Sequence, residues 1–572
     1  MLIYRDAQQS LRPSDEVVRL RRHAAAGDAA ALLVGIGELE QAVVDALRPL
    51  ADGWGAPDRA LRRGTMAAAA AYLAARARRP ADHHLRAAVA ALDAFAAAPR
   101  RAVVHAPEGY VHYALDPAGY AAAAERYRRA VGRSHAERAV VIGIRSIGTS
   151  LSAVVATVLG SARTVTVRPR GRTGARHIRA DASLVAQLAA WLADGADVLI
   201  VDEGPGATGE TMAATARWLR DLGIAEARIV LFPSHTGGPS LADRGRRAWF
   251  DAARKYPPPA GDPRPARVAA RLGLSAPRDL SAGEWRRLVR GGAAVPACTG
   301  HERSKHYARD DDGVAYLIRF AGLGRWGVAS AARATRLAEA GLAAEPRDFS
   351  DGFLVRPWIE GSPADRRVAR EADFITALDR YLCARAPLFR TGRPVETGPI
   401  LDMLCTNAAE ALGPRAGGLA AAARLLDRLP AREAVIPDGR LQPHEWLRTP
   451  AGYRKVDALD HGDGLRLPGP ADVAWDLAGA AIEFSLDDDV IAGITRRCAA
   501  AAGDDAALLD DAVAACRAPY AAYWLADATL SAREALDDFD RARLHAEALR
   551  YRAALARELR RAAARTAARR SA

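Results

Sequence analysis

The segment Val198–Met212, VLIVDEGPGATGETM, decides the fold of the first half of the chain. An apolar run is followed by the adjacent acids Asp202 and Glu203, a glycine-rich turn and the start of a second apolar pattern. This order is typical of a buried strand, a turn and a helix in a parallel sheet. Adjacent carboxylates at a strand end suit vicinal ribose hydroxyls, and the hydroxyls of Thr208 and Thr211 at a helix amino terminus suit phosphate. The alternative is a strand, turn and helix that bind nothing.

Further apolar runs on both sides of this segment extend the same pattern. They lie in AVVIGIRSIG from Ala139, RTVTVRPRG from Arg163 and ARIVLFPSH from Ala227. Strands that alternate with helical patterns predict a parallel sheet, and we place this α/β domain at residues 99–254. Residues 1–98 are rich in Ala, Leu and Arg at helical spacing, so they predict a helical amino-terminal segment.

The chain as a whole is too long for a single core. Its 572 residues, 50% apolar and 26% charged, predict a soluble, multidomain protein. The five cysteines form no Cys-x-x-Cys pair, which argues against a zinc knuckle or a disulfide framework and favours a reducing compartment. The start, MLIYRDAQQS, does not read as a secretory signal, and Ser146–Ala162 is shorter than the roughly 20 apolar residues that span a bilayer. We therefore expect a cytoplasmic protein without a membrane partner.

The net charge of +13 makes nucleic acid a candidate partner. Most of this charge is arginine mixed with Asp and Glu along predicted helices, which is typical of solvated helix faces. The basic carboxyl end, RELRRAAARTAARRSA from Arg557, lacks aromatic residues that could stack on bases. We interpret this end as a solvated helix and keep a nucleic-acid-binding arm as the alternative.

The acidic pair and Thr-Gly-Glu-Thr resemble the phosphoribosyl pyrophosphate motif of type I phosphoribosyltransferases. The likeness covers roughly Val140–His235, and Gly143–Leu151, GIRSIGTSL, lies where that family has its pyrophosphate loop. It implies ribose and phosphate contacts by Arg145, Gly148, Thr149, Asp202, Glu203, Thr208, Gly209 and Thr211, with basic residues nearby at Arg168, Arg170 and Arg172. It also implies Mg²⁺ and displacement of pyrophosphate from ribose by a nitrogen nucleophile. Two features depart from the family: the turn Gly204–Ala207 is one residue longer, and Glu210 adds negative charge.

A proline-rich stretch, Lys255–Arg267, ends this half of the chain. Because proline interrupts both helices and central strands, we expect a linker at 255–295 and a second, α+β domain at 296–572. Within that domain, TGHERSKHY and VAYLIRF predict two strands around an acidic turn, and a mostly helical chain follows.

This second half resembles the aminoglycoside phosphotransferase and choline kinase branch of the protein-kinase-like fold. The two strands, the linker Phe353–Gly361, the loop PDGRLQPHEWL, the strand YRKVDALD and the late Asp476–Ala478 carry the likeness. It implies ATP binding by Lys305, Arg319 and Glu360, catalysis by Asp438, and Mg²⁺ binding by Asp457 or Asp460. The loop departs from the family's His-Gly-Asp pattern, because His444 and Glu445 lie near the position of its Asn, and the family's lysine is Arg319.

Taken together, these patterns predict a cytoplasmic transferase with a phosphoribosyl pyrophosphate site in one domain and an ATP site in the other. Both domains would act on small molecules, in sequence on one nucleoside-like metabolite, and a homodimer is compatible with the sequence. Two alternatives remain open: a catalytically degenerate protein that senses nucleotides, and a nucleic-acid-associated protein.

Overall fold

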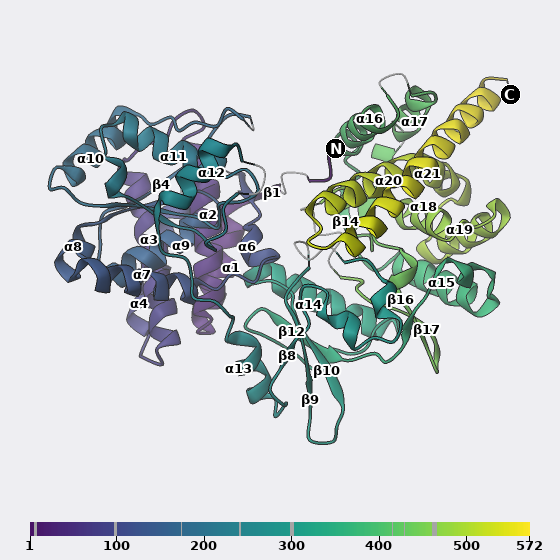
Figure 1. The fold of residues 1–572 in the computed structure, drawn as a ribbon, viewed down its shortest axis with the longest axis horizontal. Helices are drawn as coiled ribbons and strands as arrows, with labels where there is room; N and C mark the ends of the chain where they lie inside the picture. The colour runs from purple at the N-terminus through teal and green to yellow at the C-terminus, as the bar shows by residue number, and fades with distance from the viewer. Residues whose placement is uncertain are drawn as a thin grey trace. The chain divides into compact units, whose positions relative to one another are not determined.

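The computed structural model describes the whole chain except residues 5–7, 97–99, 173, 240–241, 298–301, 414–415, 428, 460–465 and 572. The chain divides into two compact units (Figure 1). The α/β unit contains Gln8–Pro263 and Gly322–Val328. The carboxy-terminal unit contains Met1–Ala7, Arg264–Ala321 and Ala329–Ala572.

The α/β unit begins with the predicted helical segment. Its helices are α1 (Pro13–Ala25), α2 (Ala29–Leu47), α3 (Ala56–Arg76), α4 (Asp82–Ala91) and α5 (Asp93–Ala96). Asp28 starts α2, because its carboxylate accepts the backbone N–H of Ala31 at 3.0 Å. A strand that the sequence did not predict, β1 (Gln8–Leu11), pairs antiparallel with β2 (Ala102–His105). The run QQSL has no β-branched residue, so its strand conformation depends on this pairing.

The parallel sheet that the apolar runs predicted follows. Its strand order is β4-β3-β5-β6-β7, and every pairing is parallel. The strands are β3 (Val140–Ile144), β4 (Thr164–Val167), β5 (Val198–Val201), β6 (Ile229–Phe232) and β7 (Arg254–Lys255). The helices are α6 (Glu108–Val111), α7 (Pro117–Val131), α8 (Arg133–Arg138), α9 (Gly148–Leu159), α10 (Ala182–Leu192), α11 (Glu210–Asp221) and α12 (Arg244–Ala252).

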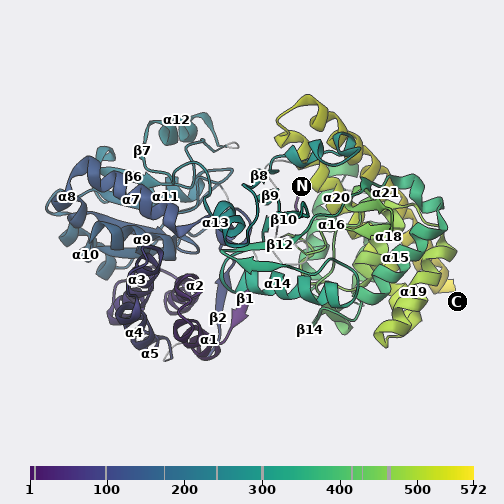
Figure 2. The same ribbon diagram turned by 90° about the horizontal axis from the view of Figure 1, so that it is seen from below.

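Helix α9 joins the helical segment to the sheet. Ala153 and Val154 of α9 are fully buried in the same apolar cluster as Leu32 and Ile36 of α2 and Leu61 of α3. Figure 2 shows α1 to α5 gathered together beside α9. The helical segment is therefore part of the α/β unit, and its apolar face is covered by α9.

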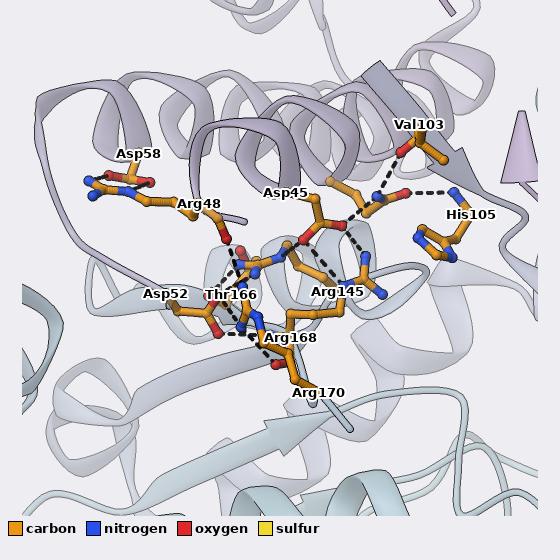
Figure 3. Close-up of polar contacts among 11 residues, drawn as sticks. Asp45, Arg48, Asp52, Asp58, Val103, His105, Arg145, Thr166, Arg168 and Arg170 are labelled. Carbon is orange, nitrogen blue, oxygen red and sulfur yellow. Dashed lines mark hydrogen bonds and ion pairs between the residues drawn. The ribbon is translucent and has the colours of Figure 1, made fainter. Parts of the chain in front are cut away.

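A network of buried charges links the loop after α2 to the carboxyl edge of the sheet (Figure 3). Arg145, directly after β3, donates to Asp45 of α2 at 2.8 Å and also pairs with Asp52. After β4, Arg168 pairs with Asp45, and Arg170 donates to Asp52 at 3.0 Å. The side chains of Arg145 and Asp52 are each 1% exposed. Burial of the Asp45 carboxyl opposes its ionisation, but Arg145 and Arg168 outweigh this and hold its pKa well below its usual range.

The carboxy-terminal unit contains an antiparallel sheet of order β11-β12-β10-β9-β8. Its strands are β8 (Arg278–Asp279), β9 (Lys305–Arg309), β10 (Ala315–Phe320), β11 (Asp348–Ser350) and β12 (Phe353–Pro357). Between β10 and β11 the chain forms α14 (Gly324–Glu339), which belongs to this unit from Ala329 onward. The strands β9 and β10 are the two predicted around the acidic turn. Shorter strands form the sheets β13-β16-β17 and β14-β15: β13 (Ser362–Pro363), β14 (Arg390–Pro394), β15 (Glu433–Val435), β16 (Trp446–Thr449) and β17 (Gly452–Lys455).

Helices dominate the rest of this unit, as predicted. They are α15 (Ala372–Arg385), α16 (Gly398–Leu412), α17 (Leu419–Leu426), α18 (Ala474–Glu483), α19 (Asp488–Ala502), α20 (Ala506–Glu534) and α21 (Asp538–Ser571). In the basic helix α21, Leu555 and Leu559 are buried, Arg561 pairs with Asp488 at 2.8 Å and Arg565 pairs with Asp510 at 2.6 Å. Among the described residues, no helix is long and apolar enough to cross a membrane.

The segment 255–295, expected to be a linker, is structured over much of its length. The units divide between Pro263 and Arg264, inside the proline-rich stretch. Beyond the prolines, α13 (Arg264–Arg271) and β8 belong to the carboxy-terminal unit, and Val268 and Ala269 are buried there. The prolines therefore interrupt regular structure locally, whereas the apolar residues that follow them join a core.

Replacing Arg145 by Met tests the buried network. The expected loss is about 3–5 kcal/mol of the unfolding free energy of the α/β unit at pH 7, because Asp45 and Asp52 would lose a buried partner. Urea-dependent hydrogen exchange of peptides from β3 and β5 measures this unit alone. The control is Arg133→Met, which removes a surface pair with Glu137 and should leave stability unchanged. A loss below about 1 kcal/mol in Arg145→Met would contradict the structural role of the network.

Candidate functional site

The carboxyl ends of β3 and β5 meet at the point where the strand order reverses. From β3 the chain crosses to β4 on one side and then returns to β5 on the other. The two strands pair in register, with Gly143 opposite Val201. Segments that follow two such strands form the usual ligand-binding position of an open parallel sheet. The two motifs recognised in the sequence, GIRSIGTSL and DEGPGATGET, therefore begin side by side.

The acidic pair follows β5 directly. Asp202 is 8% exposed, and its backbone carbonyl accepts a hydrogen bond from Tyr120 Oη of α7 at 2.9 Å. The carboxylate of Glu203 accepts the backbone N–H of Gly109 at 2.6 Å. The two adjacent acids are thus held by different elements, Asp202 by α7 and Glu203 by α6.

Both carboxyls hold their protons more tightly than usual. Burial raises the pKa of Asp202 to about 7. Burial, with the neighbouring charges of Glu108 and Asp202, raises the pKa of Glu203 well above its ordinary value. A buried acid that titrates near neutrality is typical of functional sites in enzymes.

The glycine-rich turn leads from the acids to the amino terminus of α11. Gly209 has a φ of 63°, in the left-handed region that favours glycine, and α11 begins at the next residue. Arg246 of α12 donates to the Thr208 carbonyl at 2.8 Å. The carboxylate of Glu210 accepts the N–H groups of Gly174 and Arg176, at 2.9 and 3.0 Å. Glu210, a departure from the family motif, therefore holds the loop after β4.

Two residues expected to contact phosphate are buried in the packing instead. The guanidinium of Arg145 is held by Asp45 and Asp52. Thr149 is fully buried, and its carbonyl accepts from Arg62 of α3 at 2.7 Å. Gly148 is needed for close approach, because a Cβ there would lie 2.6 Å from the Val201 carbonyl oxygen. These positions fix α9 against β5. The sequence did not predict this packing role, because it does not show that α2 and α3 are neighbours of these residues.

Sequence reasoning also missed contributors from other elements. Tyr120 of α7, Gly109 of α6 and Arg246 of α12 reach the acidic pair or the turn. None belongs to a recognisable motif, and no pattern in the sequence links these residues to the turn. Residues on helices therefore make more contacts in this site than the sequence indicated.

In the carboxy-terminal unit, the two predicted ATP-binding cations are neighbours. Lys305 of β9 lies opposite Arg319 of β10 in the strand register. Lys305 pairs with Glu302 at 3.5 Å and lies over the ring of Trp285. Arg319 pairs with Asp457 at 2.7 Å, so the sheet contacts the predicted metal-binding residue. Glu360 is exposed in the segment after β12.

Asp457 lies beyond the end of the strand that the sequence YRKVDALD predicted to contain it. The strand β17 stops at Lys455, and Asp457 has a φ of 51° beyond it. Asp460, the alternative metal ligand, lies outside the described residues. Among the residues that the structure describes, no three His, Cys, Asp or Glu side chains gather as a metal site. Mg²⁺ commonly takes one or two protein carboxylates and completes its shell with phosphates and water, which fits Asp457.

Asp438, the predicted catalytic residue, has no exposed surface. Its carboxylate accepts a hydrogen bond from Tyr381 Oη and pairs with Lys455 Nζ at 3.3 Å. The carboxylate of Asp476 accepts the N–H groups of Asp438 and Gly439, each at 2.8 Å. Burial raises the pKa of Asp476 to about 6. The structure therefore does not support substrate contact by Asp438, which instead anchors its loop.

The residues after Asp438 form a second polar group. Arg440 forms an ion pair with Glu445 at 2.9 Å, and Glu445 is 6% exposed. Burial, together with the charge of Arg440, lowers the pKa of His444 to about 3. His444 is thus neutral at physiological pH, whereas Glu445, the other residue expected near the family's Asn position, is ion-paired.

No family model matches the chain, and no curated protein matches it in sequence. A solved choline kinase of Streptococcus pneumoniae is 14% identical over 50% of this chain and 96% of that chain, with a TM-score of 0.31. An aminoglycoside phosphotransferase of Alicyclobacillus acidocaldarius is 17% identical over 46% of this chain and 91% of that chain, with a TM-score of 0.32. An ethanolamine kinase of Plasmodium vivax is 11% identical over 43% and 79%, with a TM-score of 0.30.

The raised pKa of Asp202 predicts a pH dependence. A carboxyl with a folded pKa of about 7 and an unfolded pKa of about 3.9 stabilises the fold at low pH and loses that contribution as pH rises through 7. Relative to wild type, Asp202→Asn should gain stability between about pH 4 and pH 8. Urea unfolding at several pH values measures this difference. Asp221→Asn, at the other end of α11, serves as the control, and a pH-independent difference for Asp202→Asn would refute the prediction.

Proposed function

We propose that the α/β unit binds a phosphorylated ribose at the carboxyl ends of β3 and β5. The observation that carries this proposal is the meeting of Asp202, the glycine-rich turn and the amino terminus of α11 at the reversal point of the parallel sheet. Such a reversal point is where open parallel sheets bind ligands. The resemblance to type I phosphoribosyltransferases makes phosphoribosyl pyrophosphate the expected ligand and group transfer the expected reaction.

The roles within this site follow from the contacts described. Asp202 and Glu203 would bond the ribose hydroxyls, and the free N–H groups of the first turn of α11 would bond a phosphate. Arg246, with its side chain 20% exposed beside the turn, adds positive charge. Mg²⁺, bound to the diphosphate, would neutralise charge on the leaving group.

Ligand-induced stabilisation tests this site. Millimolar phosphoribosyl pyrophosphate with MgCl₂ should raise the melting temperature of the wild type, because a ligand that binds the folded state stabilises it. The double variant Asp202→Asn/Glu203→Gln should lose the shift, and Asp221→Asn should keep it. Ribose 5-phosphate in a parallel sample reports how much of the shift needs the diphosphate. No shift in wild type, or an equal shift in the double variant, would reject the proposal.

The carboxy-terminal unit is proposed to bind a nucleotide such as ATP. The support is the pairing of Arg319 on β10 with Asp457 after β17, with Lys305 beside Arg319. Lys305 and Arg319 would face phosphate oxygens, and Asp457 would hold Mg²⁺ against them. The sequence resemblance to the choline kinase and aminoglycoside phosphotransferase branch makes a small-molecule phosphotransferase the corresponding activity.

A second candidate function is nucleotide sensing without phosphoryl transfer. It is favoured by Asp438, which is 0% exposed and engaged by Tyr381 and Lys455. General-base catalysis requires a carboxylate within reach of the substrate hydroxyl. Binding of ATP without turnover would distinguish this function from phosphotransfer.

Calorimetry with ATP and MgCl₂ tests nucleotide binding. Asp457→Asn should weaken Mg²⁺-dependent binding at least about tenfold, because a neutral amide holds the cation less well. Asp402→Asn, an exposed position on α16, is the matched control and should bind as wild type does. Equal affinity in wild type and Asp457→Asn would exclude this metal role, and absence of binding by wild type would exclude the nucleotide.

A further inference from the structure

Two cysteines that are 115 positions apart in the sequence meet in the carboxy-terminal unit. Cys383 lies on α15 and Cys498 on α19, and their Sγ atoms are 2.7 Å apart. Both are free thiols. In the sequence the cysteines form no Cys-x-x-Cys pair, and their spacing along the chain gave no sign that Cys383 and Cys498 meet.

We propose that Cys383 and Cys498 form a reversible disulfide that links α15 to α19. The two helices are packed against each other, so the pair can bond without a large movement of the backbone. Cys383 is partly exposed, whereas Cys498 is buried with 0% exposed surface. An oxidant from solution therefore reaches Cys383 first.

The step balances with glutathione disulfide as the oxidant. The Cys383 thiol loses its proton, and its sulfur attacks one sulfur of glutathione disulfide, releasing one glutathione. The Cys498 sulfur then attacks the Cys383 sulfur of the mixed disulfide, loses its proton and releases the second glutathione. Two thiols are oxidised, one disulfide of glutathione is reduced to two thiols, and both protons end on glutathione. Excess reduced glutathione reverses both exchanges.

The link would fix a helix that holds the loop of Asp438. Tyr381 and Arg385 flank Cys383 on α15, where Tyr381 donates to Asp438 and Arg385 donates to the Ala458 carbonyl at 3.1 Å. A covalent tie between α15 and α19 therefore restrains the residues on which this loop depends. Cross-links that close long stretches of chain restrict the unfolded state most, so the oxidised protein should be more stable.

Peptide mapping of the full-length protein tests the proposal. After equilibration with glutathione disulfide, alkylation and digestion without reductant, mass spectrometry should find the Cys383 peptide linked to the Cys498 peptide. The oxidised protein should melt at least about 5 °C higher than the reduced protein, and dithiothreitol should reverse the shift.

Single variants provide the controls. Cys383→Ser and Cys498→Ser should each lose the linked peptide and the melting shift, whereas Cys405→Ser and Cys298→Ser should keep both. The peptide map of the wild type tests for the disulfide even if a variant fails to fold. Free thiols at both positions in glutathione disulfide, glutathione adducts alone, or a link to a different cysteine would overturn the proposal.

Discussion

The pairing of Asp45 and Asp52 with the arginines after β3 and β4 is the constraint on which the α/β unit depends. A buried guanidinium is tolerated only when carboxylates and carbonyls satisfy it, and Arg145 is 2% exposed. Because its partners belong to α2 and the loop after it, this part of the helical segment must lie against the carboxyl edge of the sheet. The apolar contacts of α9 with α2 and α3 stabilise the same arrangement.

The ion pairs of Arg145 limit which residues can bind a ligand at the neighbouring carboxyl ends of β3 and β5. Since Arg145 is committed to Asp45 and Asp52, it does not supply the charge that the sequence motif assigned to phosphate. The site is left with the amino terminus of α11, the Thr208 and Thr211 hydroxyls, and Arg246 beside the turn. Asp202 remains buried with a raised pKa, because burial outweighs the hydrogen bonds that favour its charged form. At the proposed ribose phosphate site, recognition would therefore depend mainly on backbone N–H groups and on the acidic pair.

The carboxy-terminal unit also contains a group of buried charged and polar side chains. Asp438 and Lys455 are both without exposed side-chain surface, and Tyr381, Arg385 and Asp476 complete a buried polar group around the loop. Hydrogen bonds and ion pairs among these buried side chains restrain the loop that carries Asp438. Asp438, which the sequence suggested as the catalytic residue, therefore supports its loop. The ion pair of Arg319 with Asp457 instead joins β10 to the segment after β17.

The sequence by itself determined the parallel strands β3 to β6, the helices around them, the turn after β5 and the position of Asp202 at a strand end. These features are local, because apolar runs, turn residues and helix starts act over a few neighbours. Only the tertiary structure decided that Arg145 meets Asp52, 93 positions away, that Asp438 is buried, and that Cys383 meets Cys498. Burial and ion pairing depend on which elements pack together, and residue types at one point of a chain do not specify partners that distant.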